Sequence, residues 1–249
     1  HWAKNLFLYI PLFFAGEIFN LQKVVELFIG FIAFSLIASS IYIINDYRDV
    51  EADRIHPVKH KRPIASGAVS KPAALVFFVL CLAIGGLLAW YVRPKFAFVA
   101  GIYFIINLLY SFGLKNISIL DILILSTGFV LRVKAGGVAA NIAVSEWLMI
   151  MVFLLALFMA IAKRRDDVLI KTQSGQDMRK AVKGYNMDFM NVMLALVSAV
   201  IIVAYLMYTM APETMSRFGT YRLYYTCLFV IGGLLRYLQI TYVENNTGS

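Results

Sequence analysis

A short run of oxygen-bearing side chains is the feature of this sequence most suited to chemistry. It contains one amide and three carboxylates, Asn45, Asp46, Asp49 and Asp53. The run continues a strongly apolar segment, so we expect it to be helical. At 100° per residue the four side chains then share an arc of about 100° on the helix surface. Glu51 lies off that face, and we interpret it as a solvated acid.

These side chains favour a divalent metal, because three carboxylates on one face repel each other unless a cation joins them. Mg²⁺ takes hard oxygen ligands, keeps several waters and shares its remaining positions with substrate phosphates. We therefore predict that the amide and the three aspartates bind Mg²⁺ and that the aspartates are catalytic. The alternative is a charged helix end whose acids pair with Arg48 and Arg54 at helical spacing.

A basic stretch directly after the acids argues against a simple helix end. It includes Arg54, His56, Lys59 and Arg62. Pro57 should end the helix near His56 and fold the rest back as a loop. Carboxylates that bind a metal, next to guanidinium and ammonium donors, are typical of a polyphosphate site, since the planar Arg group binds phosphate through two hydrogen bonds. His56 fits a phosphate donor better than a metal ligand, because no HExxH zinc spacing occurs.

The composition places this site on a membrane protein. Of the 249 residues, 61% are hydrophobic and 15% are charged, whereas a soluble domain has roughly 45–50% and about 25%. This excludes an ordinary cytosolic enzyme, a disordered chain and a fibrous repeat. A spanning helix needs about 20 apolar residues. We expect an all-α, polytopic bundle forming a single integral membrane domain over 1–249, with eight spans at about 5–19, 24–45, 73–92, 96–112, 117–133, 147–162, 188–211 and 221–243.

The basic residues predict the orientation of these spans. The net charge is +9, and 13 of the 23 Lys and Arg residues fall in the two segments 46–72 and 163–187. Because cytoplasmic loops are enriched in Lys and Arg, we place the N-terminus and both segments in the cytoplasm, as polar loops that cap the active site. Topology and phosphate binding account for the basic excess, so we expect no nucleic-acid partner.

The first motif resembles a known family. The pattern Asn45-Asp46-x-x-Asp49-x-x-x-Asp53, followed by the run Arg-Pro-Ile-Ala-Ser-Gly at 62–67, is similar to the first signature of the UbiA-type intramembrane prenyltransferase superfamily. The run 53–63 resembles one branch of it, the polyprenyl-phosphate phosphoribosyltransferases. Shorter matches occur at 2–5, 110–115, 131–132, 163–165 and 236–238. The resemblance implies a UbiA-like bundle with nine membrane helices in a complete chain.

The second motif of the superfamily departs from its pattern here. Members that use a prenyl diphosphate carry a second aspartate cluster, but residues 162–167 read Ala-Lys-Arg-Arg-Asp-Asp. An enzyme whose lipid is a monophosphate nucleophile needs one metal cluster and one cationic cradle, which this arrangement matches better. For Lys163 and Arg164 the alternatives remain open: a basic anchor at a helix end, or a Lys163–Asp167 pair.

The resemblance implies transfer of 5-phosphoribose from phosphoribosyl diphosphate to a decaprenyl-type polyprenyl phosphate, releasing diphosphate, for the synthesis of a cell-wall arabinan precursor. Basic residues after the motif would hold the donor phosphates. The remaining substrate-binding candidates are Lys4, Tyr110, Lys115, Arg132, Lys163 and Arg164. Arg132 is costly in an apolar helix, so an inward polar role is expected, with Gly136 and Gly137 permitting a helix break.

Two other functions remain open. One is prenyl transfer from a prenyl diphosphate to an aromatic acceptor, and the other is membrane transport, for which charged groups near the bilayer midplane would be expected. We expect a location in a bacterial inner (plasma) membrane and leave a homo-oligomer open.

Overall fold

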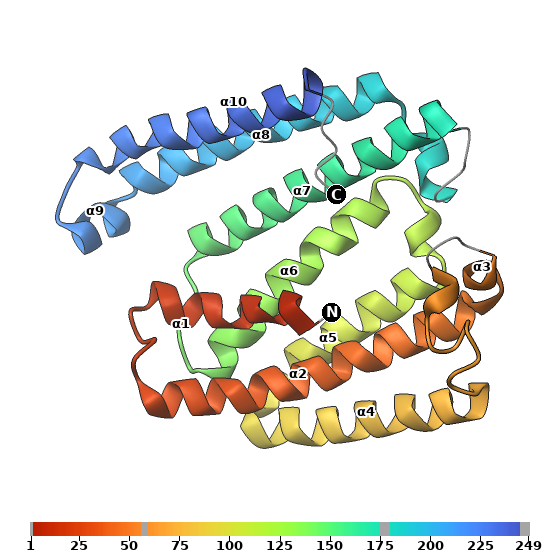
Figure 1. Ribbon diagram of the computed structural model, residues 1–249. Coiled ribbons are helices and arrows are strands. Elements are labelled where there is room, and N and C mark those ends of the chain that lie inside the picture. The colour runs from red at the N-terminus through yellow and green to blue at the C-terminus, as the bar shows by residue number, and fades with distance from the viewer. Residues whose placement is uncertain (1, 56–58, 175–179, 245–249) are drawn as a thin grey trace. The chain divides into compact units, whose positions relative to one another are not determined.

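The computed structural model describes residues 2–55, 59–174 and 180–244, and over these ranges every regular element is a helix (Figure 1). This confirms the predicted all-α fold. The chain forms two compact units, the first of residues 1–115 and 128–144 and the second of 116–127 and 145–249. His56 and Pro57 lie outside the described residues.

The first unit is built around one long helix. Its elements are η1 (Trp2–Tyr9), α1 (Ile10–Phe14), α2 (Leu21–Arg48), α3 (Val50–Arg54), η2 (Lys59–Lys61), α4 (Lys71–Val92), α5 (Pro94–Phe112) and the first two residues of η3 (Leu114–Asn116). The C-terminal part of α6 (Leu120–Ala139) belongs to it as well. Helix α2 packs against α4, α5 and η1, and Figure 1 shows α2 and α4 side by side. Phe34, Ile37, Phe96 and Tyr103 are buried in its core.

The second unit contains the remaining helices. These are α7 (Glu146–Ser174), η4 (Lys180–Gly184), α8 (Met187–Met210), α9 (Pro212–Phe218), η5 (Arg222–Thr226) and α10 (Cys227–Tyr242), together with the first residues of α6. Helix α8 packs against both α7 and α10 (Figure 1). The core between them includes Phe158, Ile161, Met190, Leu194 and Ile201.

Seven helical segments of the described chain are long and apolar enough to cross a membrane. They are Leu21–Arg48, Lys71–Val92, Pro94–Phe112, Leu120–Ala139, Glu146–Thr172, Met187–Met210 and Arg222–Tyr242. They match seven of the eight predicted spans. The first predicted span, 5–19, instead forms η1 and the short α1. This segment docks on the protein, because Asn5 is buried and donates to Ser35 Oγ at 2.9 Å.

Three helix boundaries differ from the sequence prediction. The first difference concerns the polar segment that begins at residue 163, which was predicted to be a loop. This prediction is wrong for the residues up to Ser174, because α7 continues to that residue. Its charges have partners on the helix, as in the Arg164–Asp167 pair, so the helix does not need to end there. Helix α6 also runs unbroken through Gly136 and Gly137 to Ala139. The third difference is an interruption of the predicted helix at Asp49.

Candidate active site

The four oxygen-bearing side chains of the motif lie where α2 gives way to α3. Asn45 and Asp46 are on the last turn of α2, Asp49 separates the helices with φ −88° and ψ 4°, and Asp53 lies in α3. The Asp49 N–H donates to the Asn45 carbonyl at 3.0 Å, and the Asp49 carbonyl accepts from the Asp53 N–H at 2.8 Å. These bonds continue the helical ladder across the interruption, so the four residues stay on neighbouring turns.

Two cations join these side chains in pairs. Arg62 Nη1 donates to Asp46 Oδ1 and to Asp53 Oδ2, at 2.8 Å each. Lys115 Nζ donates to both Asp49 oxygens, at 2.8 and 2.7 Å, and to Asn45 Oδ1 at 3.2 Å. The structure therefore brings together all four predicted metal ligands with two of the predicted substrate-binding residues.

A small apolar core positions Arg62. Ile64 and Ala65 follow it in the loop before α4, and both are buried against Val50 of α3 and Ala74 of α4. The Arg62 N–H donates to the Lys59 carbonyl at 2.9 Å, which closes the turn of η2. Two apolar residues in an otherwise polar loop thus hold the arginine beside the carboxylates.

The end of α5 positions Lys115. Gly113 follows the helix with φ +151°, a conformation that favours glycine, and lets the chain turn into η3. Arg48 fixes the end of α5 to α2: its Nη1 donates to the Ser111 carbonyl at 2.6 Å, and its guanidinium lies 4.2 Å from the centre of the Phe112 ring. Lys115 consequently reaches residues 66 and 70 positions earlier in the chain.

The donor atoms fit Mg²⁺ in their chemistry. All are hard oxygens, and each pair already converges on one cationic nitrogen. Among the described residues, however, no three acidic, His or Cys side chains are close enough to hold one metal together. Mg²⁺ usually takes one or two protein carboxylates and completes its shell with water and phosphate. The residues therefore fit the ion as two pairs rather than as one cluster of four.

The remaining candidates of the first unit lie at varied depths. Arg54 is exposed, 3.8 Å from Glu51, and Lys4 is exposed on η1. Lys59 is half-buried in η2, and Tyr110 is half-buried on the last turn of α5. The positions of these four residues do not test their predicted roles in substrate binding, which stay predictions.

Arg132 is buried in the first unit and faces inward. Its Nε donates to Asn5 Oδ1 at 3.0 Å, its Nη1 to the Gly128 carbonyl at 2.9 Å and its Nη2 to the Tyr103 hydroxyl at 2.7 Å. The guanidinium also lies 4.8 Å from the centre of the Tyr103 ring. These contacts tie η1 to α5 and α6, and the sequence did not identify Asn5 or Tyr103 as partners.

A buried ionic network organises the second unit. Arg164 Nε donates to Asp121 Oδ2, and Arg164 Nη1 donates to Asp167 Oδ2 at 2.8 Å. The Tyr185 hydroxyl donates to Asp121 Oδ1 at 2.7 Å and accepts from the Ile119 N–H. Burial, with the hydrogen bond to Asp121, raises the pKa of Tyr185. Arg164 is thus part of an internal network that joins α6, α7 and the segment before α8.

The three consecutive cations of α7 point in different directions. Lys163 is exposed, and Arg164 is buried in the network above. Arg165 Nε donates to Asn191 Oδ1 at 2.8 Å, and its guanidinium lies 5.0 Å from the centre of the Tyr242 ring. Sequence reasoning missed Asp121, although an acid within the apolar run 117–133 is the same signal that singled out Arg132.

Comparison with known proteins identifies the family of the chain. The chain matches the model of the UbiA prenyltransferase family over residues 6–247. It is 38% identical over 208 residues to the decaprenyl-phosphate phosphoribosyltransferase of Mycolicibacterium smegmatis, a match that covers 82% of this chain and 65% of the relative. The Corynebacterium glutamicum protein of the same name is 35% identical, and that match covers 82% of this chain and 63% of the relative. The match thus spans less than two thirds of the length of these relatives.

A solved structure shares the fold. A UbiA homolog from Archaeoglobus fulgidus, bound to DMAPP and Mg²⁺, matches with a TM-score of 0.73 at 20% identity, covering 96% of this chain and 83% of the homolog. The family match extends over nearly the whole sequence and includes the α2–α3 motif. The chain belongs to the UbiA prenyltransferase family.

Proposed function

We propose that this integral membrane protein transfers 5-phosphoribose from phosphoribosyl diphosphate to a decaprenyl-type polyprenyl phosphate, with release of diphosphate, for cell-wall arabinan synthesis. Two relatives at 38% and 35% identity are named for that lipid substrate and that transferred group. The observation that carries the proposal is the set of four oxygen-bearing side chains at the α2–α3 junction, which Arg62 and Lys115 join in two pairs. We propose that these two pairs together serve one diphosphate.

The reaction breaks the bond between ribose C1 and the diphosphate oxygen and forms a bond between C1 and an oxygen of the lipid phosphate. Its transition state resembles an oxocarbenium ion, as in other glycosyl transfers. The lipid phosphate is already anionic at pH 7, so no general base is needed. Asp46 with Asp53, and Asn45 with Asp49, would hold Mg²⁺. The bound ion would stabilise the charge that develops on the leaving diphosphate.

The cations of the first unit would bind the phosphates. Arg62 makes both of its carboxylate bonds through Nη1, so the other nitrogens of its guanidinium can donate to a donor phosphate. Arg54, His56 and Lys59 are proposed to assist it. Lys115 is proposed to bind the lipid phosphate or the ribose 5-phosphate, with further contributions from Lys4 and Tyr110. Lys163 lies in the second unit, and its role as a phosphate ligand stays a prediction.

Two residues that were predicted to bind substrate fit better as positioning residues. Arg164 donates to Asp121 and Asp167 while its side chain is only 2% exposed, and Arg132 is held by three neutral partners in the first unit. We propose that Arg164 orders the second polar segment, which carries Lys163, and that Arg132 orders the N-terminal segment, which carries Lys4.

The site should open to the cytoplasm, where a soluble, highly charged sugar phosphate is available. The predicted orientation places the α2–α3 junction there, in the plasma membrane of a bacterium. We propose that the whole chain acts as one transferase domain, in which the apolar helices accommodate the isoprenoid chain.

The test uses the full chain in detergent with phosphoribosyl diphosphate labelled in the ribose. We expect label to enter the organic phase only when polyprenyl phosphate is present. Asp53→Asn should abolish this transfer, whereas Glu51→Gln, on the same short helix but 76% exposed, should retain it. Active Asp53→Asn protein, or wild-type protein that leaves all label in the aqueous phase, would contradict the proposal.

A second candidate is transfer of a prenyl group from its diphosphate. It is favoured by the fold shared with the A. fulgidus homolog that binds DMAPP and Mg²⁺. This reaction would use the same α2–α3 side chains and would need a second set of carboxylates. Of the two acids at the matching place on α7, Asp166 and Asp167, the second is bonded to Arg164. Consumption of a labelled prenyl diphosphate in place of phosphoribosyl diphosphate would select this candidate.

A further inference from the structure

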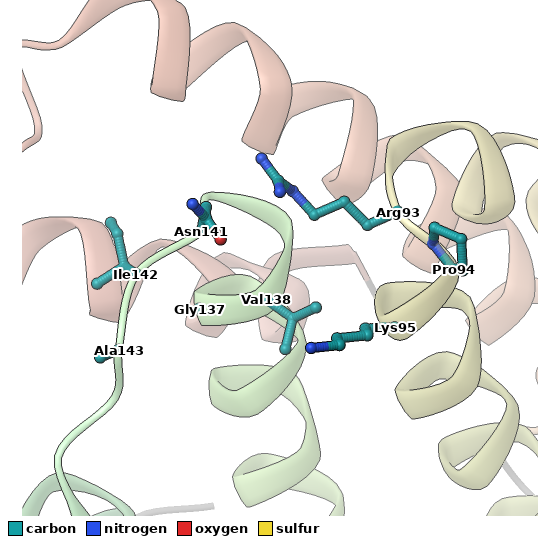
Figure 2. A pocket seen from close by; sticks show the side chains of 8 residues that line it. All are labelled: Arg93, Pro94, Lys95, Gly137, Val138, Asn141, Ile142 and Ala143. Carbon is teal, nitrogen blue, oxygen red and sulfur yellow. The ribbon is translucent and has the colours of Figure 1, made fainter.

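A pocket of about 720 Å³ opens in the first unit at the junction of α4 and α5, beside the C-terminal end of α6 (Figure 2). It lies at the end of α5 opposite to the candidate active site. Lys95 is on the first turn of that helix, and Lys115 follows its last turn. The 19 residues of α5 span about 28 Å. The pocket is therefore separate from the carboxylate cluster by about the thickness of a bilayer core.

The lining of the pocket is both basic and apolar. Arg93 and Lys95 supply two cations, Asn141 supplies an amide, and the other lining residues are Pro94, Gly137, Val138, Ile142 and Ala143. None of these lining residues is acidic. In Figure 2 the side chains of Arg93 and Lys95 extend from the α4–α5 junction toward the end of α6. An anion with an attached apolar group would match both halves of this lining.

The cations differ in how firmly they are held. Arg93 Nε donates to the Ala139 carbonyl at 3.4 Å, and Arg93 Nη2 lies 3.5 Å from Glu26 Oε2. Both side chains of that ion pair are more than a third exposed, so solvent screens their interaction. Lys95 is exposed and extends beside Val138. The pocket therefore presents two cations, of which, within the described residues, only Arg93 is paired with a carboxylate, that of Glu26, and this pair is screened.

The backbone on the α6 side has a fixed shape. Asn141 adopts a left-handed conformation with φ 53°, and the Ile142 N–H donates to the Gly137 carbonyl at 2.8 Å. A Cβ on Gly137 would come within 2.3 Å of Val144 Cγ2, so only glycine allows the chain to fold back this closely. The wall that faces the cations is thus a defined turn.

Aromatic side chains place the pocket at the edge of the bilayer. Trp90 and Tyr91 lie on the last turn of α4 and are 65% and 79% exposed, and Phe98 near the start of α5 is 71% exposed. Trp and Tyr collect at membrane–water interfaces. The two cations are therefore at the depth of lipid headgroups, on the membrane face opposite to the carboxylate cluster.

We propose that this pocket binds the phosphate headgroup of an anionic phospholipid from that leaflet. Arg93 and Lys95 would donate to the phosphate, as basic pockets between membrane helices do for anionic lipids. Val138 and Ile142 would contact the glycerol and the start of the acyl chains. A soluble phosphate would leave this apolar half of the lining without a partner.

The test measures which lipids stay bound to the full chain. The protein is reconstituted into nanodiscs with equal amounts of phosphatidylglycerol and phosphatidylcholine, and native mass spectrometry counts the lipids retained after release. We expect retained phosphatidylglycerol to exceed phosphatidylcholine on the order of thirtyfold for two cations at the surface. The double variant Arg93→Gln with Lys95→Gln should lose this preference. Arg217→Gln with Arg222→Gln removes two cations from α9 and η5 and should keep it.

Several results would overturn the proposal. These are equal retention of both lipids by the wild type, an unchanged preference in the Arg93/Lys95 double variant, or an equal loss in the Arg217/Arg222 control. Displacement of the lipid by millimolar inorganic phosphate would show that the pocket takes a free anion instead. Lys95→Gln alone changes an exposed side chain and should fold normally, so an unreduced preference in that variant would also contradict the proposal.

Discussion

Replacing Asp121 with Asn should strongly destabilise the second unit, because the buried Arg164 guanidinium would lose the fully buried one of its two carboxylate partners and keep only Asp167. The Arg164 and Asp121 side chains are 2% and 0% exposed. Removing one partner of a buried ion pair costs about 3–5 kcal/mol. By comparison, breaking the exposed pair of Arg236 and Glu244, whose side chains are 57% and 42% exposed, should cost at most about 1 kcal/mol.

The assay is the free energy of unfolding in detergent, followed by circular dichroism during denaturant titration. Arg236→Gln is the matched control in the same unit. A third variant replaces both members of the buried pair, Asp121→Leu with Arg164→Met. This variant leaves no buried charge at either position, and the Asp167 carboxylate that loses Arg164 is 13% exposed and can be hydrated. The variant should therefore be closer to the wild type than Asp121→Asn.

Two results would refute this reasoning. One is an Asp121→Asn protein within about 1 kcal/mol of the wild type, as expected for a screened surface pair. The other is a double variant at least as unstable as Asp121→Asn. In either case Arg164 would be available for substrate phosphate rather than committed to the internal network.

Three further predictions concern the metal, its ligands and pH. Asp49→Ala should lower the initial rate of phosphoribosyl transfer by about a hundredfold or more, because it removes charge that would hold the metal, whereas Glu51→Ala should leave the rate near that of the wild type. EDTA should abolish the transfer and added Mg²⁺ should restore it; a rate unchanged by EDTA would exclude an essential ion. The raised pKa of Tyr185 means that its contribution to stability is fully present below about pH 10 and is lost as the pH rises through the folded-state pKa. The stability difference between wild type and Tyr185→Phe should therefore be constant below about pH 9 and shrink as the pH rises above about pH 10, and a difference that stays constant above about pH 10 would contradict this.

The location of the oxygen cluster could be predicted from sequence because it depends on local spacing. Asn45, Asp46, Asp49 and Asp53 lie within nine residues, and a helix alone brings them to neighbouring turns. The apolar runs likewise predicted seven membrane spans, because the length and composition of each run decide by themselves whether it can cross the bilayer.

The partners of these residues could not be predicted, because they are distant in the chain. Lys115 reaches Asp49 only because α5 returns along α2 and turns at Gly113. Arg164 meets Asp121 from 43 residues away. The end of α7 was predicted wrongly for a different, local reason. A charged run is typical of a loop by composition, but Arg164 and Asp167 pair three residues apart on the helix, and α7 continues to Ser174.

The most direct test of the proposed function offers the chain both donors at once. Phosphoribosyl diphosphate labelled with ¹⁴C in the ribose and a ³H-labelled prenyl diphosphate are incubated with the protein, Mg²⁺, polyprenyl phosphate and an aromatic acceptor. We expect ¹⁴C to enter the lipid phase in amounts that follow the polyprenyl phosphate, and ³H to remain in its diphosphate. Transfer of ³H to the aromatic acceptor without ¹⁴C in the polyprenyl lipid would contradict phosphoribosyl transfer.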